Sequence, residues 1–244
     1  MKQLLLISSS RYNGGEYLAH CARAMQEFLG ILGKKENIAF VPYAYAEAKW
    51  DSYTKDMREI FNGMGYNLMS VHDETFDYQL IADKNTKAIF VGGGNTFRLL
   101  KEIYHRDIIE IIKRRVNAGE IKYIGISAGS NVACPTIKTT NDMPIVYPPS
   151  LIALNLINFQ INPHFISGKI PGHMGEDREY RIKEFHEEND IPVVGLPESN
   201  WIKVDGEECR LCGAGKAVVF RKNGDDSLWI SGRESFVIKK ERIL

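Results

Sequence analysis

The chain has 244 residues, 44% of them hydrophobic and 25% charged, and its 31 basic and 31 acidic side chains cancel. This composition is that of an ordinary globular protein, and the lack of net positive charge or a basic cluster argues against nucleic acid as a partner. The apolar run at residues 4–7 is too short for a secretory signal, and no window approaches the ~18 apolar residues of a membrane span. We therefore expect a cytoplasmic protein that binds neither nucleic acid nor membrane.

Short apolar runs alternate with amphipathic stretches over the first two thirds of the chain. The predicted elements are a strand at 2–7, a helix at 16–32, a strand at 38–41, a helix at 52–64, strands at 67–71 and 88–91, one or two helices within 96–118, and a strand at 122–126. This order is typical of an α/β protein with a mainly parallel sheet and helices on both faces. From residue 193 onward, strands at 201–204, 217–221 and 235–238 alternate with glycine turns and predict a C-terminal antiparallel extension. We expect one domain over residues 1–244.

The strand at 122–126 leads into Gly125-Ile126-Ser127-Ala128-Gly129, after which a short helix can begin. A serine between two glycines at a strand-to-helix turn is typical of a nucleophile elbow, because the glycines permit a sharp turn that exposes the hydroxyl. Ser127 is therefore our candidate nucleophile.

Three glycines, Gly92 to Gly94, follow the strand at 88–91. They match neither a Walker loop nor a dinucleotide fingerprint, which leaves an oxyanion hole or a plain tight turn. Beside a nucleophile elbow we favour an oxyanion hole made by the N–H groups of Gly92 or Gly93 together with that of Ala128.

A serine nucleophile needs a base, and the chain has six histidines. His164 follows Pro163 at the end of an apolar run, 151–161, so we place it beyond a strand end and expect it to be the base. The other five are placed less well, in helices or loops: His20, His72, His105, His173 and His186.

Two carboxylates compete to orient His164. Asp142 lies in a loop after the elbow helix, and Glu198 follows the apolar run 192–196. Either could accept a hydrogen bond from the imidazole. We lean toward Glu198, because a strand-end position suits a fixed orienting group better than a loop turn.

Cys209 and Cys212 have C-x-x-C spacing, but the chain contains no second such pair for zinc, and the pair does not begin a helix as a redox motif would. We expect no metal and no cofactor.

Six blocks of this sequence together resemble peptidase E, the aspartyl dipeptidase family, in order and spacing. They are VGGGNTF (91–97), YIGISAG (123–129), ACPTIKTTNDMPIV (133–146), QINPHF (160–165), GHMGEDRE (172–179) and GLPE (195–198). The resemblance implies a sheet akin to that of class I glutamine amidotransferases and a serine peptidase that removes N-terminal aspartate from Asp-X dipeptides. It carries over Ser127 as nucleophile, His164 as base, and Asp142 or Glu198 as the third member.

The same resemblance implies that Arg178 holds the aspartyl carboxylate of the substrate, and Asn95, in the first block, is a further candidate substrate-binding residue. Alternatively, Arg178 could be a surface residue paired with Glu176 or Glu179. Three other functions stay open: a general esterase, disfavoured because no histidine follows His186; a β-aspartyl peptidase of the cyanophycinase kind; and a non-catalytic binding protein on the same fold. The expected partner is a small peptide substrate, and a homodimer stays open.

Overall fold

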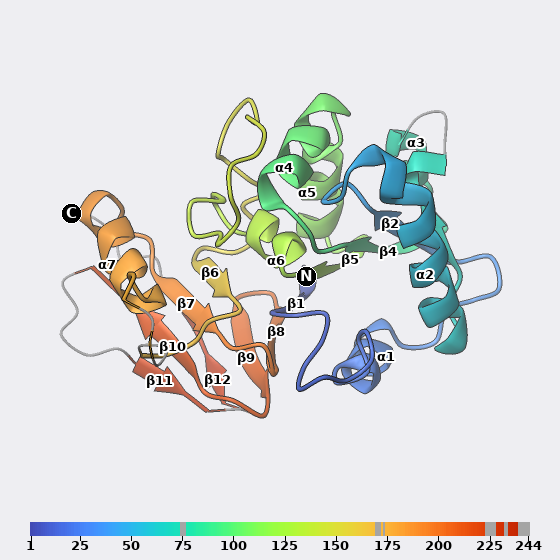
Figure 1. Cartoon of the computed structure of the whole chain (residues 1–244). Coiled ribbons are helices and arrows are strands. Elements are labelled where there is room, and N and C mark those ends of the chain that lie inside the picture. The colour runs from blue at the N-terminus through green and yellow to red at the C-terminus, as the bar shows by residue number, and fades with distance from the viewer. Residues whose placement is uncertain (74–76, 169–171, 173, 223–227, 232–233, 239–244) are drawn as a thin grey trace.

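The computed structural model describes residues 1–244 except 74–76, 169–171, 173, 223–227, 232–233 and 239–244 (Figure 1). Its centre is an eight-stranded sheet with the order β12-β9-β8-β1-β5-β4-β2-β3. Five of these strands form its parallel half: β1 (Gln3–Ile7), β2 (Asn37–Val41), β3 (Leu68–Ser70), β4 (Thr86–Val91) and β5 (Lys122–Ile126). Three antiparallel strands extend it beyond β1: β8 (Asn200–Asp205), β9 (Glu208–Gly213) and β12 (Ser235–Phe236).

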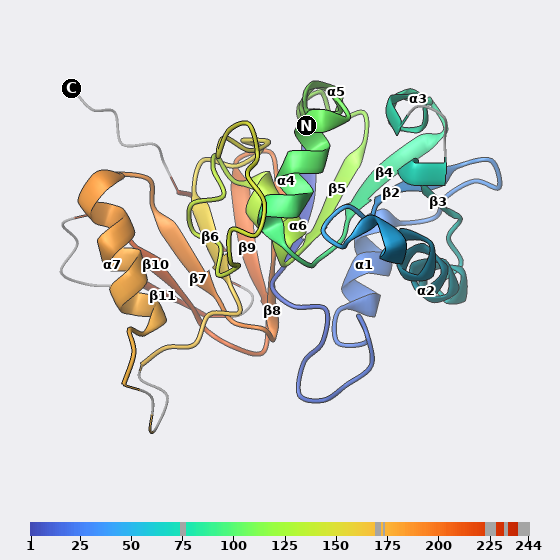
Figure 2. The same cartoon turned by 45° about the horizontal axis from the view of Figure 1, so that its top comes forward.

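Helices cover both faces of the parallel half, as expected (Figures 1 and 2). In β1, Leu5 and Ile7 face one cluster of buried side chains, while Leu4 and Leu6 face another, because successive side chains of a strand point to opposite sides. The first cluster is closed by α1 (Ala22–Leu29) and α2 (Trp50–Gly63). The second is closed by α3 (Asp77–Ala82), α4 (Thr96–His105), α5 (Ile109–Asn117) and α6 (Ala128–Ala133). Burial on both faces explains why these strands are apolar throughout rather than alternating.

A second, four-stranded sheet lies beside the first and was not anticipated from the sequence. Its order is β11-β10-β7-β6, with β6 (Gln160–Pro163) parallel to β7 (Val193–Leu196), and with β10 (Ala217–Phe220) and β11 (Leu228–Ile230) antiparallel. One face joins the main core through Val194 and Leu196, and α7 (Arg178–Glu188) covers the other (Figure 1). The predicted antiparallel tail is therefore divided between two sheets.

The other differences between the predicted and the observed elements concern helices. The helix expected at 16–32 begins only at Ala22, because Leu18 takes a left-handed conformation with φ 61° and its N–H donates to Ser10 O. Two short 3₁₀ helices, η1 (Glu47–Lys49) and η2 (Val71–Asp73), were also not expected. No helix in the described part of the chain is both long and apolar enough to cross a membrane.

Candidate active site

Ser127 stands at the turn between β5 and α6, at the carboxyl end of the parallel strands. Its backbone has φ 50° and ψ −105°, an uncommon conformation for a residue with a side chain. The glycines on either side make the turn feasible, since a Cβ on Gly125 would collide with the backbone of Gly129, and one on Gly129 with the carbonyl of Val91. Backbone strain held by such close packing is common at functional sites.

The hydroxyl of Ser127 lies 2.8 Å from Nε2 of His164, and Nδ1 of His164 lies 2.8 Å from Oε1 of Glu198. His164 follows β6 and Glu198 follows β7, so the parallel β6–β7 pair presents both side chains at one edge of the second sheet. The imidazole is 36% exposed and the carboxylate 49%, which leaves the three groups open to a substrate. The geometry is that of a nucleophile, a base and an orienting carboxylate in hydrogen-bonded series.

Ser8, which was not identified from the sequence, hydrogen-bonds the backbone of His164. Its hydroxyl is fully buried, accepts a hydrogen bond from the His164 N–H at 2.9 Å and donates one to Leu196 O at 2.8 Å. His164 has φ 54°, so its backbone also takes the left-handed conformation. Ser8 thus fixes the histidine backbone to the strand that leads to Glu198.

Asp142 does not contact His164. Its carboxylate accepts hydrogen bonds from the backbone N–H of Thr96 at 2.8 Å and from the Thr96 hydroxyl at 2.6 Å, at the N-terminus of α4. A carboxylate is stabilised there by the free N–H groups and the helix dipole. Asp142 therefore caps a helix and anchors its own loop, and the structure brings only Glu198 to the imidazole.

The backbone N–H groups near Ser127 differ in availability. The N–H of Gly92 donates to Val41 O at 3.1 Å, so this predicted oxyanion donor is engaged in a backbone hydrogen bond. Gly93 lies beside the nucleophile, since a Cβ added to it would sit 3.5 Å from Cβ of Ser127. The Ala128 N–H at the start of α6 makes no hydrogen bond to any described residue. Ala128 and Gly93 remain as candidates.

Arg178 begins α7 and is linked to the base through one amide. Its guanidinium donates to Oδ1 of Asn141, whose Nδ2 donates to Pro163 O at 2.7 Å, next to His164. Burial lowers the pKa of Arg178, and nearby Arg181 lowers it further. In the described part of the chain no carboxylate pairs with Arg178, and Glu179 instead accepts hydrogen bonds from Ser167 and Gly168. Arg178 is thus a half-buried cation near the site that no described carboxylate neutralises.

Both ends of the Asn95 side chain amide are hydrogen-bonded to the backbone. Its Oδ1 accepts from the N–H of Arg98 as the N-cap of α4, and its Nδ2 donates to Met143 O at 2.9 Å. These bonds hold the loop after α6 against α4, and they leave little of the side chain amide for a substrate.

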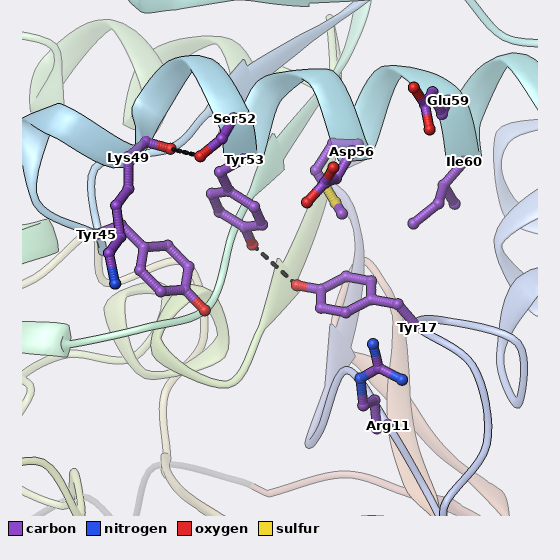
Figure 3. A pocket seen from close by; sticks show the side chains of 10 residues that line it. Arg11, Tyr17, Tyr45, Lys49, Ser52, Tyr53, Asp56, Glu59 and Ile60 are labelled. Atoms are coloured by element: carbon purple, nitrogen blue, oxygen red, sulfur yellow. Dashed lines mark hydrogen bonds between the residues drawn. The ribbon is translucent and has the colours of Figure 1, made fainter.

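Behind the glycine loop lies a pocket lined by the three tyrosines Tyr17, Tyr45 and Tyr53 (Figure 3). The hydroxyls of Tyr17 and Tyr53 are 3.0 Å apart. Tyr53 is almost fully buried, and burial raises its pKa well above the usual value. Burial also raises the pKa of Tyr17, so this hydrogen-bonded pair of phenols stays neutral.

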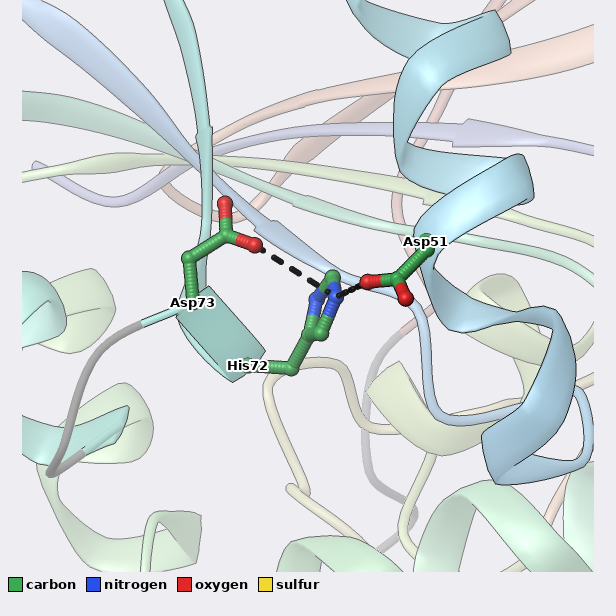
Figure 4. Close-up of side chains that lie close together, drawn as sticks. All are labelled: Asp51, His72 and Asp73. Atoms are coloured by element: carbon green, nitrogen blue, oxygen red, sulfur yellow. Dashed lines mark hydrogen bonds and ion pairs between the residues drawn. The ribbon is translucent and has the colours of Figure 1, made fainter.

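His72 lies far from Ser127. It follows β3, three strands from β5 in the sheet, which corresponds to ~14 Å at the usual strand spacing. Its Nε2 lies 3.0 Å from Asp51 and 3.4 Å from Asp73 (Figure 4). These three side chains could offer ligand atoms to a metal, but Arg58 already pairs with Asp73 and supplies a positive charge there.

Among the described residues, no other histidine hydrogen-bonds Ser127. His20 packs against Trp201, and burial lowers its pKa, an effect that nearby Glu198 opposes. His186 lies buried on α7, and His173 lies outside the described residues. Cys209 and Cys212 lie three positions apart on β9 and so point to opposite faces of the sheet, which does not suit a shared metal.

Comparison with known proteins agrees with this fold. The model of peptidase family S51 matches residues 4–212. The chain is 44% identical over 226 residues to peptidase E of Nostoc sp., covering 92% of this chain and 91% of that protein. It is 46% identical over 205 residues to peptidase E of Haemophilus influenzae, covering 84% and 92%. A solved peptidase structure from an acI-B1 actinobacterium has the same fold, with a TM-score of 0.70, 19% identity and coverage of 98% and 97%. The family match over most of the chain and these relatives show that the chain is a peptidase and belongs to peptidase family S51.

Proposed function

We propose that this peptidase is a serine-type dipeptidase that removes N-terminal aspartate from Asp-X dipeptides. The observation that carries the proposal is the series Ser127–His164–Glu198, with both hydrogen bonds at 2.8 Å and the serine on a strained turn. The relatives are named peptidase E, which supports peptidase activity for this chain.

The reaction follows from the positions of these groups. The Ser127 hydroxyl attacks the aspartyl carbonyl carbon while His164 Nε2 takes its proton. His164 then gives that proton to the leaving amine, and a water activated by the same nitrogen releases aspartate from the acyl-enzyme. Glu198 holds Nδ1–H and stabilises the imidazolium that forms in each step.

The oxyanion of each tetrahedral intermediate needs N–H donors on the side of Ser127 away from the base. The N–H of Ala128 is without an acceptor among the described residues, and Gly93 borders Ser127. Such donors contribute most when they are fixed before the reaction, as backbone groups are.

Aspartate preference is assigned to Arg178. A guanidinium binds a carboxylate through two parallel charge-assisted hydrogen bonds, and Arg178 has no anionic partner among the described residues. Asn141 holds the guanidinium next to the residue that precedes His164. A short acidic side chain bound there would lie close to the reacting carbonyl.

The test is hydrolysis of Asp-Leu, β-Asp-Leu, Asn-Leu and Glu-Leu measured side by side. We expect Asp-Leu to be cleaved best. Arg178→Ala should lower kcat/KM for Asp-Leu by about 2–3 kcal/mol, the lower part of the range for stranding one charge of a desolvated pair, because Arg178 is only half-buried. Selectivity over Asn-Leu should fall with it.

Arg221→Ala, which removes an exposed arginine just after β10, is the matched control and should leave all four rates unchanged. Equal losses on Asp-Leu and Asn-Leu in Arg178→Ala would make Arg178 a scaffold residue. Preference of the wild-type enzyme for β-Asp-Leu would instead favour the cyanophycinase-like alternative.

A further inference from the structure

The tyrosine pocket has a volume of about 610 Å³ and lies between the loop after β1 and helix α2 (Figure 3). Arg11 and Tyr17 enter it from the loop, while Tyr45, Lys49 and Tyr53 come from α2 and the segment before it. This volume is within the usual range of ~300–1,000 Å³ for small-molecule sites. Nothing in the serine–histidine–glutamate series uses these five side chains.

The glycine loop adjoins both the pocket and the nucleophile, Gly92 on the pocket side and Gly93 at Ser127. A Cβ on Gly92 would meet the Tyr53 hydroxyl at 2.6 Å. Gly93 in turn borders Ser127. One residue of backbone therefore separates the pocket wall from the reacting centre.

The β1 loop makes a second connection. Arg11 is three residues from Ser8, which holds the backbone of His164, so the two Cα atoms are at most about 11 Å apart. Between Ser8 and Arg11 the loop is held by a hydrogen bond that the Ser9 hydroxyl donates to Arg11 O at 2.7 Å. Arg11 is thus carried by the same loop whose first residue, Ser8, holds the backbone of the base.

Arg11 is charged and accessible. Its guanidinium donates to Gly15 O at 3.2 Å and lies 5.8 Å from the centre of the Tyr17 ring. Among the described residues, no carboxylate forms an ion pair with Arg11 or Lys49. Two acidic side chains, Asp56 and Glu59, line the pocket farther along α2.

We propose that this pocket receives the leaving residue X of the Asp-X substrate, and that Arg11 binds its terminal carboxylate. The proposal rests on the proposed dipeptidase function. In a dipeptide the carboxylate lies one residue, ~3.6 Å, beyond the leaving nitrogen, so a cation that binds it must extend from the pocket toward Ser127, as a long side chain on the β1 loop can. The tyrosine walls suit an apolar or aromatic X, while Asp56 and Glu59 disfavour an acidic one.

The test compares Asp-Leu with Asp-leucinamide, which lacks only the terminal charge. The wild-type enzyme should prefer Asp-Leu by about 10- to 100-fold in kcat/KM, the contribution of hydrogen bonds to a charged group. Arg11→Ala should raise KM for Asp-Leu by that factor with kcat nearly unchanged, because the contact is made equally in the ground and transition states. Hydrolysis of Asp-leucinamide should not change.

Arg23→Ala, an exposed arginine on α1 outside the pocket, is the matched control and should behave as wild type on both substrates. Arg11→Lys keeps the charge and should recover part of the preference. Equal losses on Asp-Leu and Asp-leucinamide in Arg11→Ala, or a wild-type enzyme that does not discriminate between them, would overturn the proposal alone. A folded wild-type enzyme that cleaves neither substrate would refute the proposed function, and this inference with it.

Discussion

Replacing Ser8 by alanine should damage catalysis without touching a reacting group. The substitution removes the acceptor of the His164 N–H and one of two donors to Leu196 O, whose other donor is the Phe165 N–H at 3.1 Å. The N–H of His164 is therefore left without a hydrogen-bond acceptor, which costs ~1–3 kcal/mol, and Leu196 O loses one hydrogen bond, which costs ~1 kcal/mol. We expect the free energy of unfolding to fall by about 2–4 kcal/mol.

The catalytic effect follows from the left-handed backbone of His164, which Ser8 holds in place. If that backbone relaxes, the imidazole moves from its position 2.8 Å from the Ser127 hydroxyl. A displacement of 1 Å costs roughly 10²-fold in rate, so kcat should fall by about that factor while KM for Asp-Leu stays similar.

Ser70→Ala is a suitable control. Ser70 is also fully buried at the carboxyl end of a parallel strand and hydrogen-bonds His72 Nδ1 at 2.6 Å and Phe40 O at 3.4 Å, far from Ser127. Urea denaturation and steady-state kinetics of both variants should show comparable losses of stability but a loss of kcat only in Ser8→Ala. A Ser8→Ala enzyme with kcat within about threefold of wild type would refute a positioning role.

Further predictions concern three other positions. Glu198→Gln should depress kcat by ~10²-fold or more, which is less than the ~10⁴ known for a buried carboxylate because Glu198 is half-exposed. Asp142→Asn should mainly lower the melting temperature. The reverse pattern in kinetics and calorimetry would exchange the roles of the two residues. Gly129→Ala should cost ~3 kcal/mol or more, or prevent folding, because the new Cβ would collide with a fixed backbone carbonyl; a denaturation midpoint like that of wild type would contradict this. Burial raises the pKa of Cys134 to about 12, so the folded state favours the neutral thiol. The contribution of Cys134 to the free energy of unfolding should be fully present below the pKa of the unfolded thiol, near 9, and should fall as pH rises from there toward 12. If the urea midpoint of Cys134→Ala declines with pH as that of the wild type does, other groups cause the decline.

The sequence predicted those features that depend on local backbone requirements. The turn around Ser127 needs glycine on both sides, and β1 to β5 are apolar because they are covered on both faces, so both could be identified from residue type and spacing. The second sheet could not, because β6 and β7 are separated by 29 residues and their pairing depends on contacts that no local pattern encodes.

Some site residues were missed or misassigned for a related reason. Ser8 is one of three consecutive serines, and only the position of β6 shows that its hydroxyl meets His164. The position of Ser8 at the carboxyl end of a parallel strand was the one available signal. Asp142 and Glu198 were both candidates, and the preference for Glu198 rested only on its strand-end position, because the hydrogen bonds of Asp142 to the N-terminus of α4 are not visible in the sequence.

The central claim is that Ser127 is a nucleophile activated by His164. Labelling with a small uncharged fluorophosphonate, followed by intact-mass and peptide mass spectrometry, tests it most directly. We predict one adduct, on Ser127, formed at least ~10²-fold more slowly in His164→Ala and unchanged in Arg178→Ala. An enzyme that cleaves Asp-Leu yet forms no adduct, or forms it on another residue, would contradict the account.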